Sequence, residues 1–321
     1  MDAALYLSDL ERKPEVLDAL ASVIDAGDFA AGAPDDVDRV LFLGMGSSTY
    51  AAGVVAAQLR ARGVDAVAEL ASSDLLPPPD PRTLVVAISA SGGSRETLSA
   101  TSAYAGRAPV VAVTNVDGSP ITEQADFVVN LRAEQERGGV ACRSYQHTLI
   151  ALMGIAAQLT GDDRQLGAMV RSSAVATADL LDTREDWLAD VTSALDGPAG
   201  CWVVAPARRL SNAQQGALMM REGPRRAAVS CETGDWSHVD VYLTKTLDYR
   251  MLLFAGSAYE DELLAWTAER KSLIVAVGDD VAGAAKTVRY QGDDQDDVRL
   301  LTEVLVPELV AAKLWPNATN L

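Results

Sequence analysis

The sequence predicts an α/β protein made of two units, each a mostly parallel sheet between layers of helices. Short continuous apolar runs alternate with segments at helical spacing, which is typical of buried parallel strands and their covering helices. The alternation starts again about 160 residues further on, which favours internal duplication of one α/β unit. With 321 residues, the chain is long enough for two domains of ordinary size.

The composition is that of a globular protein, with 49% apolar and 22% charged residues. Lys and Arg number 27 against 45 Asp and Glu, so the formal net charge is −18. Such a surface repels duplex nucleic acid and anionic membranes, and neither is expected as a partner. An anionic ligand must therefore be held by local geometry.

Cysteine occurs at three scattered positions, Cys142, Cys201 and Cys231, without CxxC spacing. The N-terminus, MDAALYLSDLERK, has acidic residues where a signal peptide would be basic and then apolar. No apolar stretch approaches the length of about 18 residues that suggests a transmembrane helix. We expect reduced thiols in the cytoplasm and no membrane span. Two distant histidines and scattered thiols form no ligand cluster, so no metal is expected.

The elements of the first unit follow an N-terminal helix over residues 4–26, which ends at the breaker run AGAPDD. Strands are expected at 39–44, 65–70, 84–89, 109–115 and 127–131, and helices at 49–62, 94–106 and 143–160. The expected divisions are an N-terminal helix over 1–37 and a first domain over 38–165.

The polar, helical segment 166–198 is expected to link the first domain to a second domain over 199–321. In the second domain, strands are expected at 201–206, 226–231, 250–256, 272–278 and 287–291, and helices at 211–222, 259–269 and 299–314. The acidic run GDDQDD at 292–297 is interpreted as a solvated loop.

The first candidate site is GMGSST, residues 44–49, where a strand hands over to a helix. The free amides of a helix N-terminus favour an anion, so Gly46, Ser47 and Ser48 are candidates for phosphate binding. A dinucleotide fingerprint would need a third glycine where the chain has Thr49, although Glu69 could act as a ribose ligand. A nucleotide P-loop is excluded because no Gly-Lys-Ser/Thr follows.

The second candidate site is SASGGS, residues 89–94, again between a strand and a helix. Its hydroxyls and glycines, at Ser89, Ser91, Gly92 and Ser94, suit an anion nest. In a sheet of order 2-1-3-4-5 the two preceding strands are neighbours, so both loops would face one crevice at the topological switch point. The competing interpretation is that both loops are ordinary helix caps and turns.

These residues resemble a known family. The stretches GMGSSTYAAGVVAAQL, VAELASSDL, AISASGGSRETL and AVTNVDGSPITEQADFVVNLRAEQERGGVACRS, with QGALMMREG and DWSH further on, are similar to the sugar isomerase (SIS) domain family. The resemblance extends in outline from about residue 38 to 315, and it is thinner in the second half. It is strongest to tandem-domain proteins such as the isomerase half of glucosamine-6-phosphate synthase and the fructosamine phosphate deglycases.

The resemblance implies roles for individual residues. The family's phosphate-binding hydroxyls fall on the serines already selected in the two loops, and its backbone contact to the substrate falls on Gly139, Val140 and Ala141. Its catalytic glutamate falls on Glu222. Its histidine, often supplied by the adjacent subunit, falls on His238, so the resemblance implies a homodimer with the site at the subunit interface. No cofactor is implied.

Three departures from the family pattern are visible. Ala90 replaces a phosphate-binding glutamine, Met219 replaces a lysine three residues before the glutamate, and the ending KLWPNATNL lacks the RNLAK-type lysine. The glutaminase domain of the synthases is absent from this sequence, so glutamine-dependent synthesis is not supported.

The residues themselves give weaker support for the acid and base. Any imidazole acid or base must be His147 or His238. His147 lies within an expected helix and is interpreted as structural or surface-exposed, while His238 lies in a loop. Glu222 ends a helix, where the helix dipole disfavours a carboxylate, but neighbouring arginines could simply pair with it.

The sequence thus predicts binding of a phosphorylated sugar or amino sugar. We expect aldose–ketose isomerisation, or the related deamination or deglycation, by proton transfer between C1 and C2. The alternative is a phosphosugar sensor that keeps the serine loops and catalyses nothing.

Overall fold

The computed structural model describes residues 1–29, 34, 36–162 and 164–315. It divides into two compact units. One comprises Val16–Gln135 and Arg143–Arg171 and is called the first-sheet unit here. The other comprises Met1–Glu15, Glu136–Cys142 and Ser172–Leu321 and is called the second-sheet unit. Within the described ranges, no helix has both the length and the apolar character needed to cross a membrane.

The first sheet has five parallel strands in the order β2-β1-β3-β4-β5. The expected order 2-1-3-4-5 is therefore confirmed, and β1 and β3 are neighbours. Their continuous apolar runs are buried, as expected for a parallel sheet covered on both faces. The strands are β1 (Arg39–Gly44), β2 (Asp65–Leu70), β3 (Thr83–Ile88), β4 (Val110–Thr114) and β5 (Phe127–Asn130).

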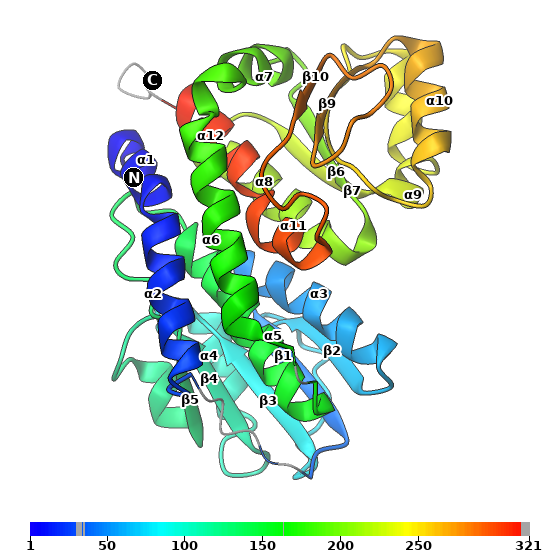
Figure 1. The fold of residues 1–321 in the computed structure, drawn as a ribbon. Coiled ribbons are helices and arrows are strands. Elements are labelled where there is room, and N and C mark those ends of the chain that lie inside the picture. The colour runs from blue at the N-terminus through cyan, green and yellow to red at the C-terminus, as the bar shows by residue number, and fades with distance from the viewer. Residues whose placement is uncertain (30–33, 35, 163, 316–321) are drawn as a thin grey trace. The chain divides into compact units, whose positions relative to one another are not determined.

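Helices cover both faces of the first sheet (Figure 1). Helix α3 (Ser47–Ala61) packs against α5 (Arg143–Thr160). Helix α4 (Arg95–Ser102) and the 3-10 turn η1 (Pro120–Gln124) pack together on a core that includes Leu41, Val85 and Ala112. The strand ends that precede α3 and α4 are thereby held at one edge of the sheet.

The second sheet repeats this topology. Its five parallel strands lie in the order β10-β9-β8-β6-β7, which is again 2-1-3-4-5 when counted from β6. The predicted fold class, two parallel-sheet α/β units, is confirmed. The strands are β6 (Cys201–Ala205), β7 (Ala228–Glu232), β8 (Arg250–Phe254), β9 (Leu273–Val277) and β10 (Lys286–Val288).

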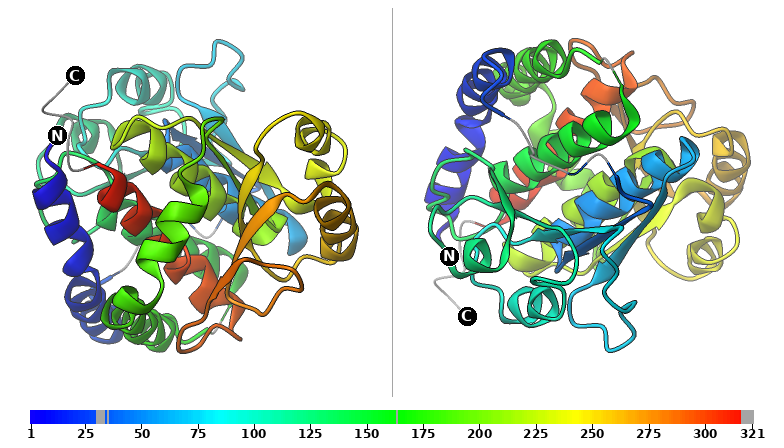
Figure 2. Two further views of the ribbon diagram at one scale, coloured as in Figure 1. Left: turned by 90° about the horizontal axis from the view of Figure 1, so that it is seen from above. Right: turned by 90° about the horizontal axis from the view of Figure 1, so that it is seen from below.

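The two faces of the second sheet carry different helices. Helices α8 (Leu210–Glu222) and α12 (Leu305–Leu314) share one core with Val203 and Phe254. Helices α9 (Thr233–Trp236) and α10 (Glu260–Arg270) share another core with Trp202 and Leu253. Viewed from above, red α12 and gold α10 lie on opposite sides of these strands (Figure 2, left).

Two expected helices are each divided into two. The N-terminal helix is α1 (Ala3–Glu11) followed by α2 (Lys13–Asp25), and the C-terminal helix is α11 (Asp296–Thr302) followed by α12. Each second helix has a proline in its first turn, Pro14 or Pro307. Proline cannot donate the backbone hydrogen bond that would continue the preceding helix, but its missing donor is tolerated in a first turn.

The remaining segments differ in detail from the expectations. The segment 166–198 holds α6 (Leu166–Asp182), η2 (Arg184–Asp186) and α7 (Leu188–Leu195). The acidic run 292–297 is only partly a solvated loop: Asp293 is buried and binds Arg289, and α11 begins at Asp296. The acidic character of the run alone did not reveal that Arg289 binds one of its aspartates.

Candidate functional site

The loop after β1 leaves the N-terminus of α3 open. Gly46 is its N-cap residue, with a positive φ of 51°, and as a glycine it offers the helix no side-chain cap. Gly44 allows the helix to approach the strand, because a Cβ atom there would lie 2.8 Å from the Cβ of Ser48. The amino end of α3, with the half-buried Ser47 and Ser48, is therefore available to an anion.

The loop after β3 is built by its own serines. Ser89 Oγ accepts a hydrogen bond from Ser94 N at 3.4 Å, and Ser91 Oγ accepts one from Gly93 N at 3.3 Å. Ser94 caps α4 by accepting from Thr97 N at 3.4 Å. These hydrogen bonds are long. The oxygens of an ionised phosphate would be better acceptors for the same hydroxyl and amide groups than the serine oxygens are.

Ser119 is a residue that the sequence analysis missed. Gly92 has a φ of 66°, and a Cβ atom there would lie 1.9 Å from Ser119 Oγ and 3.0 Å from Thr114 Oγ1. The hydroxyl of Ser119 is buried and forms no hydrogen bond with any described residue. The serine loop thus rests on the loop after β4, and only glycine fits at position 92.

The two loops share one edge of the first sheet. Leu43 pairs with Ala87 in the parallel register of β1 and β3, so the strands end at the same level and both loops begin there. This is the switch point of a 2-1-3-4-5 sheet, where ligands bind in folds of this kind. Ser94 is a helix cap as well, so capping and anion binding are compatible here.

Glu96 adds a negative charge beside the second loop. Ser94 Oγ donates to Glu96 Oε2 at 3.3 Å. Hydrogen bonding by its own backbone amide and by Ser94 lowers the pKa of the Glu96 carboxyl. A bound phosphate would compete with this carboxylate for the Ser94 hydroxyl.

In the second-sheet unit, Glu222 ends α8 and is half-buried. Burial raises the pKa of its carboxyl above the ordinary value, and the Arg221 guanidinium opposes the change. The backbone beside it is fixed, because a Cβ atom on Gly223 would lie 2.7 Å from Cε3 of Trp315.

The neighbouring arginines bind elsewhere. Arg221 Nε donates to Ala217 O at 3.2 Å, and Arg226 Nε lies 3.2 Å from Asp196 Oδ1. Among the residues that the structure describes, no ion pair involves Glu222. Glu222 is thus not held in an ion pair with any described residue, although the charge of Arg221 acts on its carboxyl.

His238 lies on the other face of the second sheet from Glu222. It follows α9 and is exposed, between Trp236 and Val241, which belong to the core on the α10 side. Helix α8, which carries Glu222, packs on the opposite core. Figure 1 shows α8 and α9 on either side of β6 and β7. The sheet itself thus separates these two side chains within one chain.

The segment 136–142 belongs to the second-sheet unit although it precedes α5. Val140 is buried in the core of α8 and α12. The carbonyl oxygen of Ala141 accepts from Gln215 Nε2 on α8 at 2.8 Å. Gly139 has a φ of 79°. Helix α8 therefore holds the segment whose backbone resembles the family's substrate contact.

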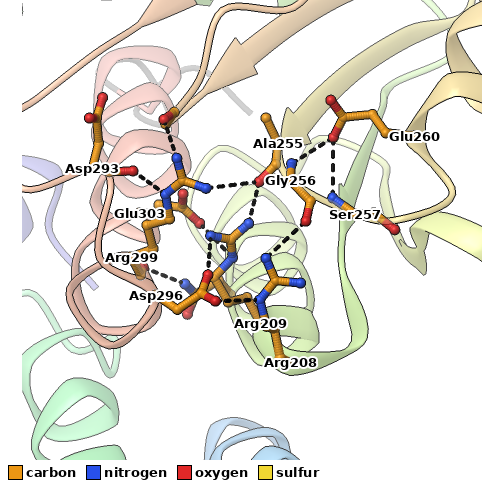
Figure 3. Close-up of polar contacts among 12 residues, drawn as sticks. Arg208, Arg209, Ala255, Gly256, Ser257, Glu260, Asp293, Asp296, Arg299 and Glu303 are labelled. Atoms are coloured by element: carbon orange, nitrogen blue, oxygen red, sulfur yellow. Dashed lines mark hydrogen bonds and ion pairs between the residues drawn. The ribbon is translucent and has the colours of Figure 1, made fainter.

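The switch point of the second sheet is filled by the protein's own side chains (Figure 3). The amides of Gly256 and Ser257, after β8, donate to Glu260 Oε2 at 2.6 and 3.4 Å. After β6, Arg208 Nη2 donates to Gly256 O at 2.8 Å, and its Nε lies 3.0 Å from Asp296 Oδ2.

Behind this loop lies a buried pair. Arg209 Nε is 3.3 Å from Glu303 Oε2, and both side chains are fully buried. Arg209 and Arg299 also donate to the carbonyl oxygen of Ala255. Burial raises the pKa of Glu303 to about 8, against the opposing effect of the two arginines. The carboxylate of Glu260 thus binds the loop amides of the second sheet, at the position where the first sheet would bind a phosphate.

Two other predicted residues are structural. His147 is completely buried, and its Nδ1 lies 2.7 Å from the carbonyl oxygen of Leu131, so it is a core residue and not a surface one. Met219, in place of the family's lysine, is buried in the core of α8 and α12.

Residues 35–157 match the SIS domain family. They are a SIS domain. The match includes both serine loops and all of the first sheet. Met1–Glu15 and most of the second-sheet unit lie outside it.

A sequence relative of this SIS-domain protein has a name that refers to a sugar phosphate. A glutamine–fructose-6-phosphate aminotransferase (isomerizing) of Aeropyrum pernix is 30% identical over 229 residues, covering 67% of this chain and 37% of the relative. The chain thus spans well under half of that protein.

Solved structures share the fold across both units. The C-terminal domain of the Francisella tularensis glucosamine-fructose-6-phosphate aminotransferase has a TM-score of 0.79 at 14% identity, covering 97% of this chain and 95% of that one. Tagatose-6-phosphate ketose/aldose isomerase of Escherichia coli has a TM-score of 0.77 at 14% identity, covering 97% and 93%.

Proposed function

We propose that the chain binds a phosphorylated sugar or amino sugar and catalyses aldose–ketose isomerisation, or the related deamination or deglycation. The observation that carries the proposal is the pair of serine loops at one switch point, one of them with an uncapped helix N-terminus. The name of the Aeropyrum pernix relative refers to fructose 6-phosphate and that of the Escherichia coli fold neighbour to tagatose 6-phosphate, and both names support this class of substrate.

In the proposed reaction, Ser47, Ser48, Ser89, Ser91 and Ser94 hold the phosphate, and the backbone of residues 139–141 contacts the sugar. Glu222 removes a carbon-bound proton from C1 or C2 and returns it to the other carbon, so the reaction passes through an enediol or enamine and needs no net oxidant. A carboxylate without an ion pair, and with a pKa raised by burial, is suited to accept a proton and return it.

We also propose that the protein acts as a homodimer, in which His238 of one chain serves the site of Glu222 in the other. The second sheet separates these residues within one chain. Next to His238 the surface exposes apolar side chains, among them Val239 at 56% and Tyr242 at 62% exposure.

All three cysteines are free and buried, and we propose a reducing, cytoplasmic location.

Two measurements test the function. Hexose and hexosamine 6-phosphates should raise the melting temperature, whereas the unphosphorylated sugars should not, because charge-assisted hydrogen bonds dominate recognition. A variant with both Ser89→Ala and Ser91→Ala should lose this shift, while Ser99→Ala, on the exposed side of α4, should keep it. Equal binding by the double variant would contradict the phosphate site.

Catalysis is tested by exchange of the C1 or C2 proton with deuterated solvent. Glu222→Gln should bind sugar phosphate normally and lose exchange by roughly 100- to 10,000-fold. The second candidate function, a phosphosugar sensor, is favoured by the burial of Met219 where the synthases have a lysine. A sensor would bind sugar phosphates without exchange in the wild type.

A further inference from the structure

The N-terminal helix α1 lies outside the matched SIS domain, yet it contacts the segment 136–142 directly. The carboxylate of Asp9 accepts hydrogen bonds from the amides of Arg137 and Gly138, both at 2.7 Å. Asp9 is only 4% exposed. Two short, charge-assisted bonds from one buried carboxylate fix the backbone immediately before Gly139.

The helix and the segment also meet through their backbones. A Cβ atom on Gly138 would lie 2.5 Å from the Cα of Tyr6, so only glycine permits this approach. The amide of Asp2 donates to the carbonyl oxygen of Gly138 at 3.1 Å. On its other side the segment is held by Gln215 of α8. Residues 138–141 are thus clamped between α1 and the helix that carries Glu222.

The same helix supports the end of α8. The ring of Tyr6 packs on Trp315 with centroids 5.4 Å apart, and the Trp315 indole lies against Gly223, next to Glu222. The phenol of Tyr6 is buried and forms no hydrogen bond with any described residue. Helix α1 therefore touches both parts of the second-sheet unit to which the proposed function assigns a role.

We propose that α1 is part of the substrate site and that Asp9 is a positioning residue, which holds the backbone of Gly139, Val140 and Ala141 in the conformation that binds the sugar. The inference rests on the proposed function, in which this backbone contacts the substrate. The expected effect is on binding of the sugar portion of the ligand, because Asp9 binds the amides of the segment that contacts the sugar in the proposed function.

The test compares two ligands by calorimetry, glucosamine 6-phosphate (or whichever hexose phosphate binds best) and inorganic phosphate. Asp9→Ala should weaken binding of the sugar phosphate about tenfold or more, as expected for losing charge-assisted bonds, and leave phosphate affinity within about twofold. Glu11→Ala is the matched control: it removes an exposed carboxylate of the same helix, which lies 2.9 Å from Arg184 Nη2, and should change neither affinity.

If Asp9→Ala does not fold, Asp9→Asn is measured instead, since it keeps the shape and one acceptor oxygen while losing the charge. A general loss of structure would weaken both ligands in parallel and would overturn the inference, as would unchanged sugar-phosphate affinity in a folded variant. A wild type that binds sugar phosphate no better than phosphate would overturn the proposed function itself, and the role of Asp9 with it.

Discussion

Glu222 and His238 lie on opposite faces of one five-stranded sheet, Glu222 on the α8 side and His238 on the α9 side. A single chain therefore does not bring them together, and the proposed site needs two copies. We expect Glu222→Gln and His238→Ala to be inactive separately and to regain activity when mixed under conditions of subunit exchange.

The expected recovery follows from counting. Half of the dimers in an equal mixture are mixed, and each mixed dimer has one site with both native residues, so about a quarter of the wild-type activity should return. Proton exchange at C1 or C2 is the measurement, and a mixture of Glu222→Gln with wild type gives the reference for partial activity. A mixture that stays inactive would contradict the shared site.

Gly92→Ala should abolish phosphate binding. The substitution places a side chain at a φ of 66° and only 1.9 Å from Ser119 Oγ, so the loop must shift. Backbone strain of this kind costs on the order of 1–3 kcal/mol in the free energy of unfolding. Gly93→Ala is the matched control, because its φ is not positive and no atom lies within 4 Å of its Cβ position. Calorimetry with inorganic phosphate should separate the two variants, and equal affinities would argue against a fixed serine loop.

The pH dependence of proton exchange should report Glu222. The base must be ionised, and burial raises its pKa, so the rate should fall on acidification at a pH above the ordinary value for glutamate. Arg221→Gln removes the cation that lowers this pKa, and the acidic limb should move to higher pH. Arg225→Gln, which removes a charge nearby in the sequence, should leave the limb in place. Equal limbs in all three proteins would assign the titration to another group.

The buried pair of Arg209 and Glu303 should make stability depend on pH. The pKa of Glu303 is raised to about 8 in the folded state, so its contribution is complete below the ordinary pKa and is lost as the pH rises through 8. The full effect is on the order of 5 kcal/mol.

Glu303→Gln removes this titration, so the melting temperature of the variant relative to wild type should increase between pH 5 and pH 9. Glu269→Gln, at an exposed position of α10, should show no such trend. A difference between Glu303→Gln and wild type that is constant with pH would show that Glu303 does not titrate in this range.

The fold and the serine loops were predictable because they depend on local pattern. Buried parallel strands are continuous apolar runs, and the order 2-1-3-4-5 predicts that the loop of Ser89 lies next to the loop of Ser47. The role of the residues around them was not predictable in the same way. Ser119 and Asp9 matter through contacts between distant segments, and no spacing in the sequence marks either residue.

The division of the expected C-terminal helix into α11 and α12 shows the same limit of prediction from sequence. The apolar pattern over 299–314 predicted one helix, and Pro307 was the only local sign of a break. The position of His238 relative to Glu222 also required the sheet, since sixteen residues of separation do not reveal that a strand and a change of face lie between them. Residues 316–321, where the family's terminal lysine would be sought, lie outside the described residues.

The switch points of the two sheets, which have the same strand order, differ in what lies at them. In the first sheet, the second serine loop makes long hydrogen bonds, and Gly46 gives α3 no side-chain cap. In the second sheet, Glu260 and the Asp296–Arg208 pair supply those charges from within the chain. The second switch point is thus neutralised by side chains of its own unit, whereas the first has the open helix end and serine hydroxyls that the proposed function assigns to a phosphate.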